Sequence, residues 1–338
     1  MKRWQSLFIG VLVSVFFLWI ALHDLDWAAV GAILQNARWQ YLLLAFGVWS
    51  LGLLARSVRW QALLGWQTRF VPTLHILNVG FLLNNTLPLR IGEVARAYLI
   101  GRKPATVSGW SALSSIVAER IIDMLAVVLM LVLVMPALPV EGAVITGAVI
   151  MGVIAVIGFV VLLVFAMKPA WAHAILGVMQ RLLPFIKRLN LSDLVDRLLE
   201  GLQPLTNWRV LSAVVGWTAV GWFLSVAGSW VVALTFPDMP QTPEMRAALT
   251  LSVVAASFSI IIPFTIASVG PFEAAAVFAL MTVALPQEIA VAYAVVWHTG
   301  VILVYAVWGV VGMLGLGLSL GQIQEGAAGF GGQESAAE

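Results

Sequence analysis

The sequence predicts an all-α polytopic membrane protein with a single transmembrane domain over residues 1–324, and three observations support this class. Of the 338 residues, 62% are hydrophobic and 10% are charged, with a mean hydropathy of +1.01, which is far from the composition of soluble proteins. Several apolar runs approach the ~20 residues that a helix needs to cross the hydrocarbon core. Lysine and arginine gather in a few connecting segments, as they do in cytoplasmic loops.

Composition also excludes several kinds of chemistry. The chain has no cysteine, so disulfides, thiolate nucleophiles and cysteine-ligated metals are excluded. Its four histidines do not fall at metal-ligand spacing. No glycine-rich nucleotide-binding loop occurs, which argues against direct ATP coupling. We therefore expect no cofactor, no metal and no nucleic-acid partner.

The first apolar run covers residues 7–22 and follows Lys2 and Arg3. Such a run is typical either of a cleaved signal peptide or of an uncleaved signal-anchor. The run ends in Leu22-His23-Asp24 without a small-residue cleavage pattern, and this favours the anchor. A second span is expected over residues 41–55. It ends at basic residues, which predicts that both ends of this pair of spans face the cytoplasm.

The next apolar segment begins at Thr73 and is only about fifteen residues long. It ends at Pro88, which lacks a backbone donor and disfavours helix at the preceding residue. The segment either crosses the membrane or re-enters on the cytoplasmic side. A crossing would place Arg90, Arg96 and Arg102 outside and would invert every later loop. Charge therefore favours a cytoplasmic re-entrant hairpin over residues 73–100.

The later elements follow from apolar length and loop charge. Further spans are predicted near residues 106–135, 143–166, 210–236 and 289–311. Residues 170–206 interleave charged and apolar side chains, which predicts amphipathic helices on the cytoplasmic interface. A second broken segment, residues 247–285, is expected to re-enter from outside. Residues 325–338 are rich in Gly, Ala and Glu, and we expect a disordered tail.

The order of these elements predicts an inverted 3+3 repeat with two re-entrant helical hairpins. Each half has two spans, a hairpin and a third span, so both termini are expected to be cytoplasmic in a multi-pass protein of the cell (inner) membrane. The two breaks share a proline followed by glycine and glutamate: Pro88, Gly92 and Glu93 in the first, and Pro263, Gly270 and Glu273 in the second. Broken segments at matching positions of inverted halves point to a substrate site near the midplane.

Three segments carry a family resemblance: Asn84-x-x-x-Pro88-x-Arg90-x-Gly92-Glu93-x-x-Arg96, Glu119-Arg120-x-x-Asp123 and Pro263…Gly270-x-x-Glu273. They resemble the signatures of the flippase-like family that includes the membrane part of lysylphosphatidylglycerol synthases, over roughly residues 5 to 320. The resemblance implies movement of an anionic or modified lipid between leaflets, such as a phospholipid or a polyprenyl-phosphate carrier. No hydrophilic stretch exceeds about forty residues, so the aminoacyl-transfer domain of the bifunctional synthases is not expected here.

The sequence departs from the family pattern in two places, one of them in the last signature. Pro271 and Phe272 stand where glycines usually precede the glutamate, and His298 occupies a place where an arginine is expected. Both departures bear on the identity of the substrate.

The first break supplies the candidate headgroup-binding residues. Arg90 and Arg96 are the expected phosphate contacts, with Asn84 and Arg120 beside them, because a guanidinium stays charged and binds phosphate oxygens bidentately. Glu93 lies three residues from each of the first two arginines on a helix, so it is expected to pair with them and favour release. The alternative is a cluster that caps the hairpin at the cytoplasmic headgroup level.

Three further carboxylates are candidates for coupling or gating. Glu119 and Asp123 lie four residues apart on one helix face and need a basic partner, for which Arg90 or Arg96 is a candidate. A static ion-pair lock between helices is the alternative. Glu273 has no cation on its own segment, so it is expected to be protonated, paired with His298 or an arginine of the first half, or bound to a coupling proton or ion.

These residues favour a lipid transporter, flippase or scramblase-like, over an enzyme. Two alternatives remain open. One is a membrane-embedded transferase that uses Glu93, Glu119 or Asp123 as a base or metal ligand. The other is a secondary transporter of a small solute or ion, which would share the repeat.

Overall fold

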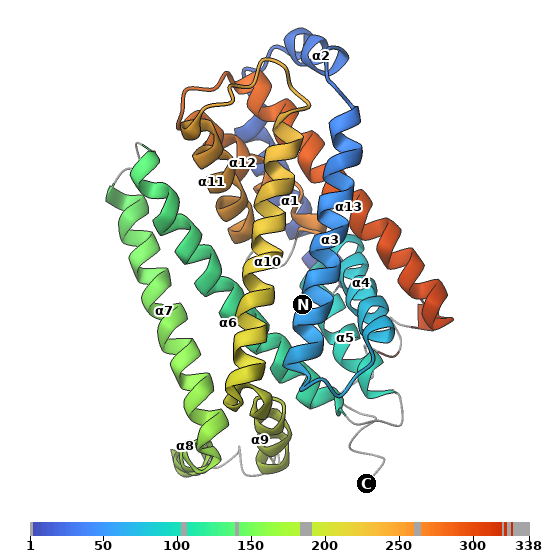
Figure 1. Cartoon of the computed structure of the whole chain (residues 1–338), viewed down its shortest axis with the longest axis vertical. Helices are drawn as coiled ribbons and strands as arrows, with labels where there is room; N and C mark the ends of the chain where they lie inside the picture. The colour runs from blue at the N-terminus through green and yellow to red at the C-terminus, as the bar shows by residue number, and fades with distance from the viewer. Residues whose placement is uncertain are drawn as a thin grey trace.

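The computed structural model describes residues 3–102, 107–138, 142–182, 191–259, 265–319, 321–322 and 326. This part of the chain is all-helical, as predicted (Figure 1). The first half contains α1 (Arg3–Leu22), α2 (Trp27–Gln35), α3 (Gln40–Leu63), α4 (Phe70–Thr86), α5 (Ile91–Gly101) and α6 (Gly109–Val134). The second half contains α7 (Gly142–Met167), α8 (Pro169–Leu182), α9 (Leu191–Glu200), α10 (Trp208–Ala233), α11 (Pro243–Ser259), α12 (Pro271–Met281) and α13 (Gln287–Leu316).

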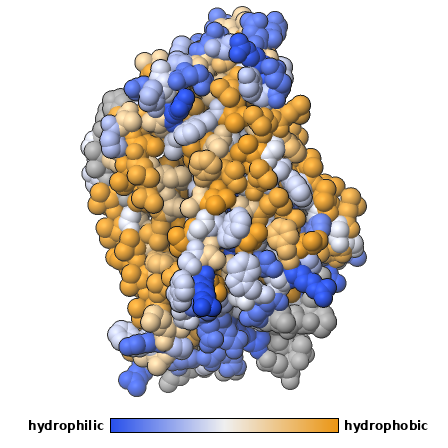
Figure 2. All heavy atoms as spheres, viewed as in Figure 1, coloured by the Kyte–Doolittle hydropathy of each residue, from blue (hydrophilic) through white to orange (hydrophobic). Residues whose placement is uncertain are grey.

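The surface of the molecule is that of a membrane protein. An apolar belt covers the middle of the visible face, and polar side chains gather at its two ends (Figure 2). By length and composition, four helices in the described part can cross a membrane: Gln40–Leu63, Val149–Met167, Trp208–Ala233 and Gln287–Leu316. The pair Phe8–Leu22 and Trp27–Gln35, bent by 83°, brings the number to five if it forms one span.

The end of the second predicted span differs most from the structure. The second span was expected to end at residue 55, before its first arginine, but α3 continues as a helix to Leu63. Arg56 and Arg59 therefore lie within the helix, and Arg59 is only 3% exposed. The helix continues because carboxylates of α6 accept its buried charge, which makes an arginine tolerable inside an apolar bundle.

The first predicted break is a tight helical hairpin. Short 3-10 geometry at Pro88–Arg90 joins α4 to α5, and the chain reverses through positive φ at Leu89 (65°) and Arg90 (53°). The two helices are antiparallel and nearly touch, since a Cβ on Gly92 would lie 1.9 Å from the carbonyl oxygen of Gly80. Asn84 Oδ1 accepts a hydrogen bond from the Gly92 amide at 2.9 Å and so caps the start of α5.

The second predicted break joins α11 to α12, which lie in the opposite half of the bundle from α4 and α5 (Figure 1). Backbone strain recurs here, with positive φ at Ala267 (52°) and Ser268 (61°) and with Gly270 at φ 95°. Gly270 is required at this position twice over, because a Cβ there would also lie 2.5 Å from the backbone oxygen of Ser14 in α1. Pro263 lies outside the described residues, as do residues 327–338 of the expected tail.

The cytoplasmic interface was predicted for residues 170–206, and this region holds α8, α9 and the 3-10 turn Gln203–Thr206. Figure 1 places α8 and α9 together at one end of the molecule, while α2 lies at the other. His173 Nε2 of α8 lies 2.8 Å from Asp196 Oδ1 of α9, and this contact links the two helices.

Candidate functional site

A cavity of about 440 Å³ opens between the tips of the two hairpins. The first tip contributes Asn84, Asn85 and Arg90, and the second contributes Thr265, Ala267 and Ser268. Helices α3, α6, α10 and α13 supply the remaining walls. The fold thus brings two breaks that lie about 180 residues apart in the sequence to one hollow.

Ion pairs fill the wall of the cavity that faces the first hairpin. Four arginines and three carboxylates from α3, the first hairpin and α6 form a continuous network: Arg59, Arg90, Arg96, Arg120, Glu93, Glu119 and Asp123. We call this set the charge network. All six of its sequence-predicted members come from the first two signatures, which are separated along the chain and adjacent in space.

Glu119 is the centre of the charge network. It is 1% exposed, and its oxygens lie 2.8 Å from Arg96 Nη2, 3.1 Å from Arg59 Nη2 and 3.2 Å from Arg120 Nη2. Three guanidinium groups around one carboxylate keep it ionised in surroundings where an unpaired charge would be very costly. The expected partner Arg96 is found, and two more arginines join it.

Arg96 does not line the cavity. Its side chain is 1% exposed, lies between Glu119 and the ring of Trp60, and has its guanidinium carbon 4.2 Å from that ring centroid. A fully buried arginine with a carboxylate and an aromatic face as partners is suited to holding helices together. This geometry is that of the ion-pair lock rather than that of a headgroup contact.

Arg90 and Arg120 lie nearer the open side of the network. Their side chains are 28% and 32% exposed, and both contact Glu93 Oε1, at 3.2 Å and 3.1 Å. Glu93 therefore bridges the first hairpin to α6, with one arginine from each. Both arginines line the cavity, so they are the sequence-predicted cations that an incoming anion would meet.

Two arginines of α3 were missed as site residues. Arg59 pairs with Asp123 through both guanidinium nitrogens, the longer contact being 3.3 Å, and Trp222 Nε1 donates to the same carboxylate at 3.1 Å. Arg56 lines the cavity one turn away and contacts Ser225 and Tyr305. The sequence offered one indication of their place: apolar residues resume after Arg56, which is typical of a helix that continues past both arginines.

The second hairpin contributes a separate polar pair. His298 Nδ1 lies 2.6 Å from Glu273 Oε1, and His298 Nε2 lies 2.9 Å from the carbonyl oxygen of Ala267. The other carboxylate oxygen, Oε2, accepts from the Gly270 amide at 2.7 Å. The ring of Phe272 stacks on the imidazole with centroids 3.9 Å apart.

The hydrogen bonds of this pair require a proton to be shared. Both imidazole nitrogens face oxygen acceptors, whereas a neutral imidazole has only one N–H to donate. Either the histidine is doubly protonated against a carboxylate, or Glu273 carries the proton and donates to Nδ1. In both cases the pair holds one proton that a simple neutral histidine and ionised glutamate would not.

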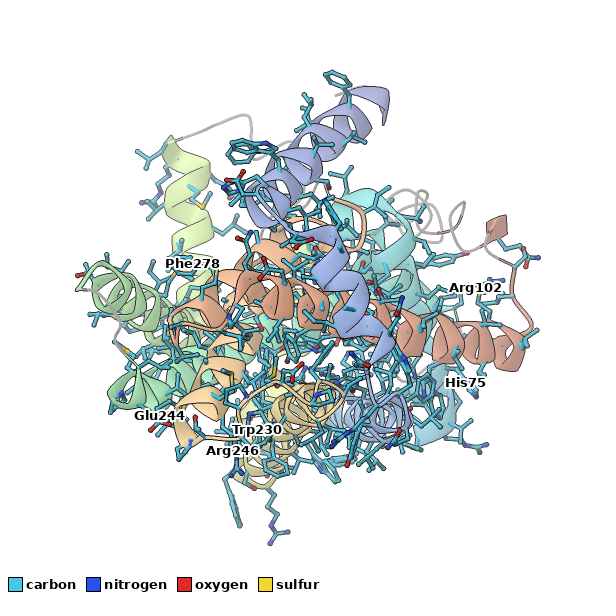
Figure 3. All side chains as sticks on the ribbon, turned by 90° about the horizontal axis from the view of Figure 1, so that it is seen from above. His75, Arg102, Trp230, Glu244, Arg246 and Phe278 are labelled. Atoms are coloured by element: carbon cyan, nitrogen blue, oxygen red, sulfur yellow. The ribbon has the colours of Figure 1, made fainter. Side chains whose placement is uncertain are left out.

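Several polar and aromatic residues lie at the edge of the molecule, outside the cavity. Seen from above, Trp230 and Arg246 lie together on one side, and His75 and Arg102 lie on the other (Figure 3). Trp230 Nε1 donates to the Arg246 carbonyl at 3.2 Å, and neither residue lines the cavity. His75 does not line it either.

Chemically, the cavity can bind an anion, because its lining includes Arg56, Arg59, Arg90 and Arg120. Among the described residues, no group of three or more His, Asp or Glu side chains lies where it could hold a metal ion. Counting Arg56 with the charge network, five arginines accompany three carboxylates, which leaves an excess of positive charge. The carboxylates nearest to the cavity are engaged by arginines.

A family model matches most of the chain. The model described as the lysylphosphatidylglycerol synthase TM region matches residues 7–309. This range includes both hairpins, the charge network and the pair formed by Glu273 and His298. No curated protein and no solved structure matches the chain significantly.

Proposed function

Because the chain belongs to the family of the lysylphosphatidylglycerol synthase transmembrane region, we propose that it moves an anionic or modified lipid between the two leaflets of a membrane. The family is a lipid-related membrane domain, consistent with lipid handling. The substrate class is an anionic phospholipid or a polyprenyl-phosphate carrier. The chain acts as a transporter in this proposal, and not as an enzyme.

The observation that carries the proposal is a single cavity that lies between the tips of both hairpins and has an excess of positive charge on the side of the first hairpin. A phosphate that leaves the headgroup region loses its hydration. Hydrogen bonds from fixed guanidinium groups compensate for part of the lost hydration free energy. Arg90 and Arg120 are partly exposed and already share Glu93. An arriving phosphate therefore competes with a carboxylate for them, which limits the affinity and permits release.

The proposed architecture is the inverted 3+3 repeat, with α4–α5 and α11–α12 as re-entrant hairpins from opposite sides. Support comes from their positions in opposite halves of the bundle and from the convergence of their tips. In this arrangement, the end with α8 and α9 is cytoplasmic, because most basic residues of the connecting segments lie there. The cell (inner) membrane, with both termini in the cytoplasm, is the corresponding location.

Proton coupling is part of the proposal. The pair formed by Glu273 and His298 holds one shared proton, and His298 lines the same cavity as Arg90 and Arg120. If this pair gains or loses a proton, the charge beside the cavity changes, and with it the electrostatic attraction for a lipid phosphate. A proton gradient could in this way drive lipid movement.

Leaflet exchange in reconstituted vesicles tests the function. Vesicles that contain the purified chain and a fluorescent phosphatidylglycerol are treated with dithionite, which quenches only the outer leaflet. Exchange faster than in protein-free vesicles supports transport. Chemically altered lipid recovered from the vesicles would instead indicate a transferase, and uptake of a headgroup-free solute without lipid exchange would indicate a solute transporter.

A further inference from the structure

We propose that Arg56 is the residue that binds the phosphodiester group of the lipid inside the cavity, an inference that rests on the proposed function and deepens it. Arg56 belongs to α3 and lines the cavity, half-buried. None of the ion pairs between described residues includes it, whereas each arginine of the charge network pairs with at least one carboxylate.

Arg56 is held by hydroxyl groups instead of by a counter-ion. Its Nη2 donates to Ser225 Oγ at 2.9 Å, and its Nη1 donates to Tyr305 Oη at 3.5 Å. A guanidinium has five N–H donors, so these two bonds leave three for a ligand. Hydroxyls orient the group but do not neutralise it, so the positive charge remains uncompensated within the apolar bundle.

The two hydroxyls have different roles. Ser225 Oγ donates its own hydrogen to the Gly221 carbonyl at 2.9 Å, so it only accepts from Arg56 and positions it. Tyr305 Oη accepts from Arg56, and the hydrogen bonds between described residues assign no acceptor to its own hydrogen. Tyr305 is therefore a second donor that a phosphate oxygen beside Arg56 would meet.

The position of Arg56 along the bundle fits a site between the two hairpin tips. It is one turn farther than Arg59 from the Leu63 end of α3, and about 10 Å of helix separate it from that end. On α13, Tyr305 and His298 line the same cavity seven residues apart, again about 10 Å. A phosphate on Arg56 would thus lie between the charge network and the pair formed by Glu273 and His298.

The surroundings of Arg56 select the class of headgroup. The guanidinium lies 5.9 Å from the ring centroid of Trp222, and the adjacent lining also includes Trp49 and Phe81. One uncompensated cation matches the single charge of a phosphodiester. A headgroup ammonium beside Arg56 would meet a like charge, and no carboxylate pairs with this arginine among the described residues. Phosphatidylglycerol is therefore preferred over phosphatidylcholine.

Binding of a short-chain lipid to the purified full chain tests this assignment. Dihexanoyl phosphatidylglycerol is titrated into the detergent-solubilised protein, and calorimetry reports the Kd. We expect Arg56→Gln to weaken binding at least tenfold and Arg56→Lys to weaken it about threefold, because lysine keeps the charge and loses the paired donors. Tyr305→Phe should weaken binding two- to fivefold. The control Arg209→Gln removes an exposed arginine of α10 outside the cavity and should leave the Kd unchanged.

Three results would overturn the inference. The first is an unchanged Kd in a monodisperse Arg56→Gln protein, and if that variant does not fold, an unchanged Kd in both Arg56→Lys and Tyr305→Phe. The second is equal affinity for dihexanoyl phosphatidylcholine. The third is equal affinity for glycerophosphoglycerol, which would assign the site to a free soluble phosphodiester. Arg56-dependent binding without leaflet exchange would support this site and contradict the proposed transport, so the two can fail separately.

Discussion

His298 and Glu273 lie 2.6 Å apart, Nδ1 to Oε1, and the second ring nitrogen of the histidine faces the Ala267 carbonyl at 2.9 Å. The pair is buried, with 4% exposure of His298 and 7% of Glu273. One of the three states expected for Glu273, pairing with His298, is therefore present. Both ring nitrogens of His298 therefore face oxygen atoms.

If the proton held by this pair is coupled to transport, removing it should remove the pH dependence of exchange. Glu273→Gln keeps an oxygen for the Gly270 amide and an NH₂ group toward the ring, but it cannot ionise. We expect its exchange rate to vary less than about twofold between pH 5 and 8, while the rate of the unmodified protein varies more. Full transport with unchanged pH dependence in Glu273→Gln would contradict the coupling role. Thr282→Ser, at the C-cap of the same helix and outside the cavity, serves as the control.

The ion pair between Arg59 and Asp123 should be a major determinant of stability. Its side chains are 3% and 15% exposed, and removing one partner of a buried pair leaves an uncompensated charge that costs about 3–5 kcal/mol. Arg59→Gln and Asp123→Asn should each lower the free energy of unfolding by that amount, measured by denaturation in mixed micelles. The double variant should cost less than the sum of the single variants. Asp196→Asn removes the exposed pair with His173 and should cost less than about 1 kcal/mol.

The close contact between Gly80 and Gly92 should not tolerate a methyl group. A Cβ at Gly92 would lie 1.9 Å from the Gly80 carbonyl oxygen and 2.6 Å from Asn84 Oδ1, so α4 and α5 must move apart. Gly92→Ala should destabilise the protein by about 1–3 kcal/mol, the usual cost of overpacking, and should slow exchange because the hairpin tip carries Arg90. Gly216→Ala in α10 has open space around it and should be neutral or slightly stabilising. Equal stability of the two variants would show that the hairpin adapts without strain.

Arg96 distinguishes a structural arginine from a ligand contact. The ring of Trp60 and the carboxylate of Glu119 enclose its guanidinium, and lysine provides neither the planar face nor the fork. Arg96→Lys should lower the unfolding free energy by about 1–3 kcal/mol, while its Kd for dihexanoyl phosphatidylglycerol should change less than twofold. A large loss of lipid affinity in a stable Arg96→Lys protein would restore Arg96 as a headgroup contact.

Partner choice within the charge network was only partly predictable. The need of Glu119 and Asp123 for a cation followed from two acids in the middle of an apolar helix, and Arg96 was a correct candidate for Glu119. Asp123 instead pairs with Arg59 and Arg120. The sequence alone predicts that Arg59 follows the cytoplasmic end of a span. A charged residue after an apolar run looks the same in a sequence whether it faces water or a buried carboxylate.

The sequence by itself determined the all-helical membrane class, the two breaks and the family, because apolar length, proline position and spacing of charged residues are local properties of the chain. The tertiary structure decided which of the candidate cations are enclosed and which face the cavity. Arg96 is enclosed by Trp60 and Glu119, whereas Arg56 has hydroxyl partners and, within the part of the chain that the structure describes, no carboxylate partner. The physical reason is that the free energy of a buried charge depends on the groups that the fold places around it, and those groups come from helices far apart in the sequence.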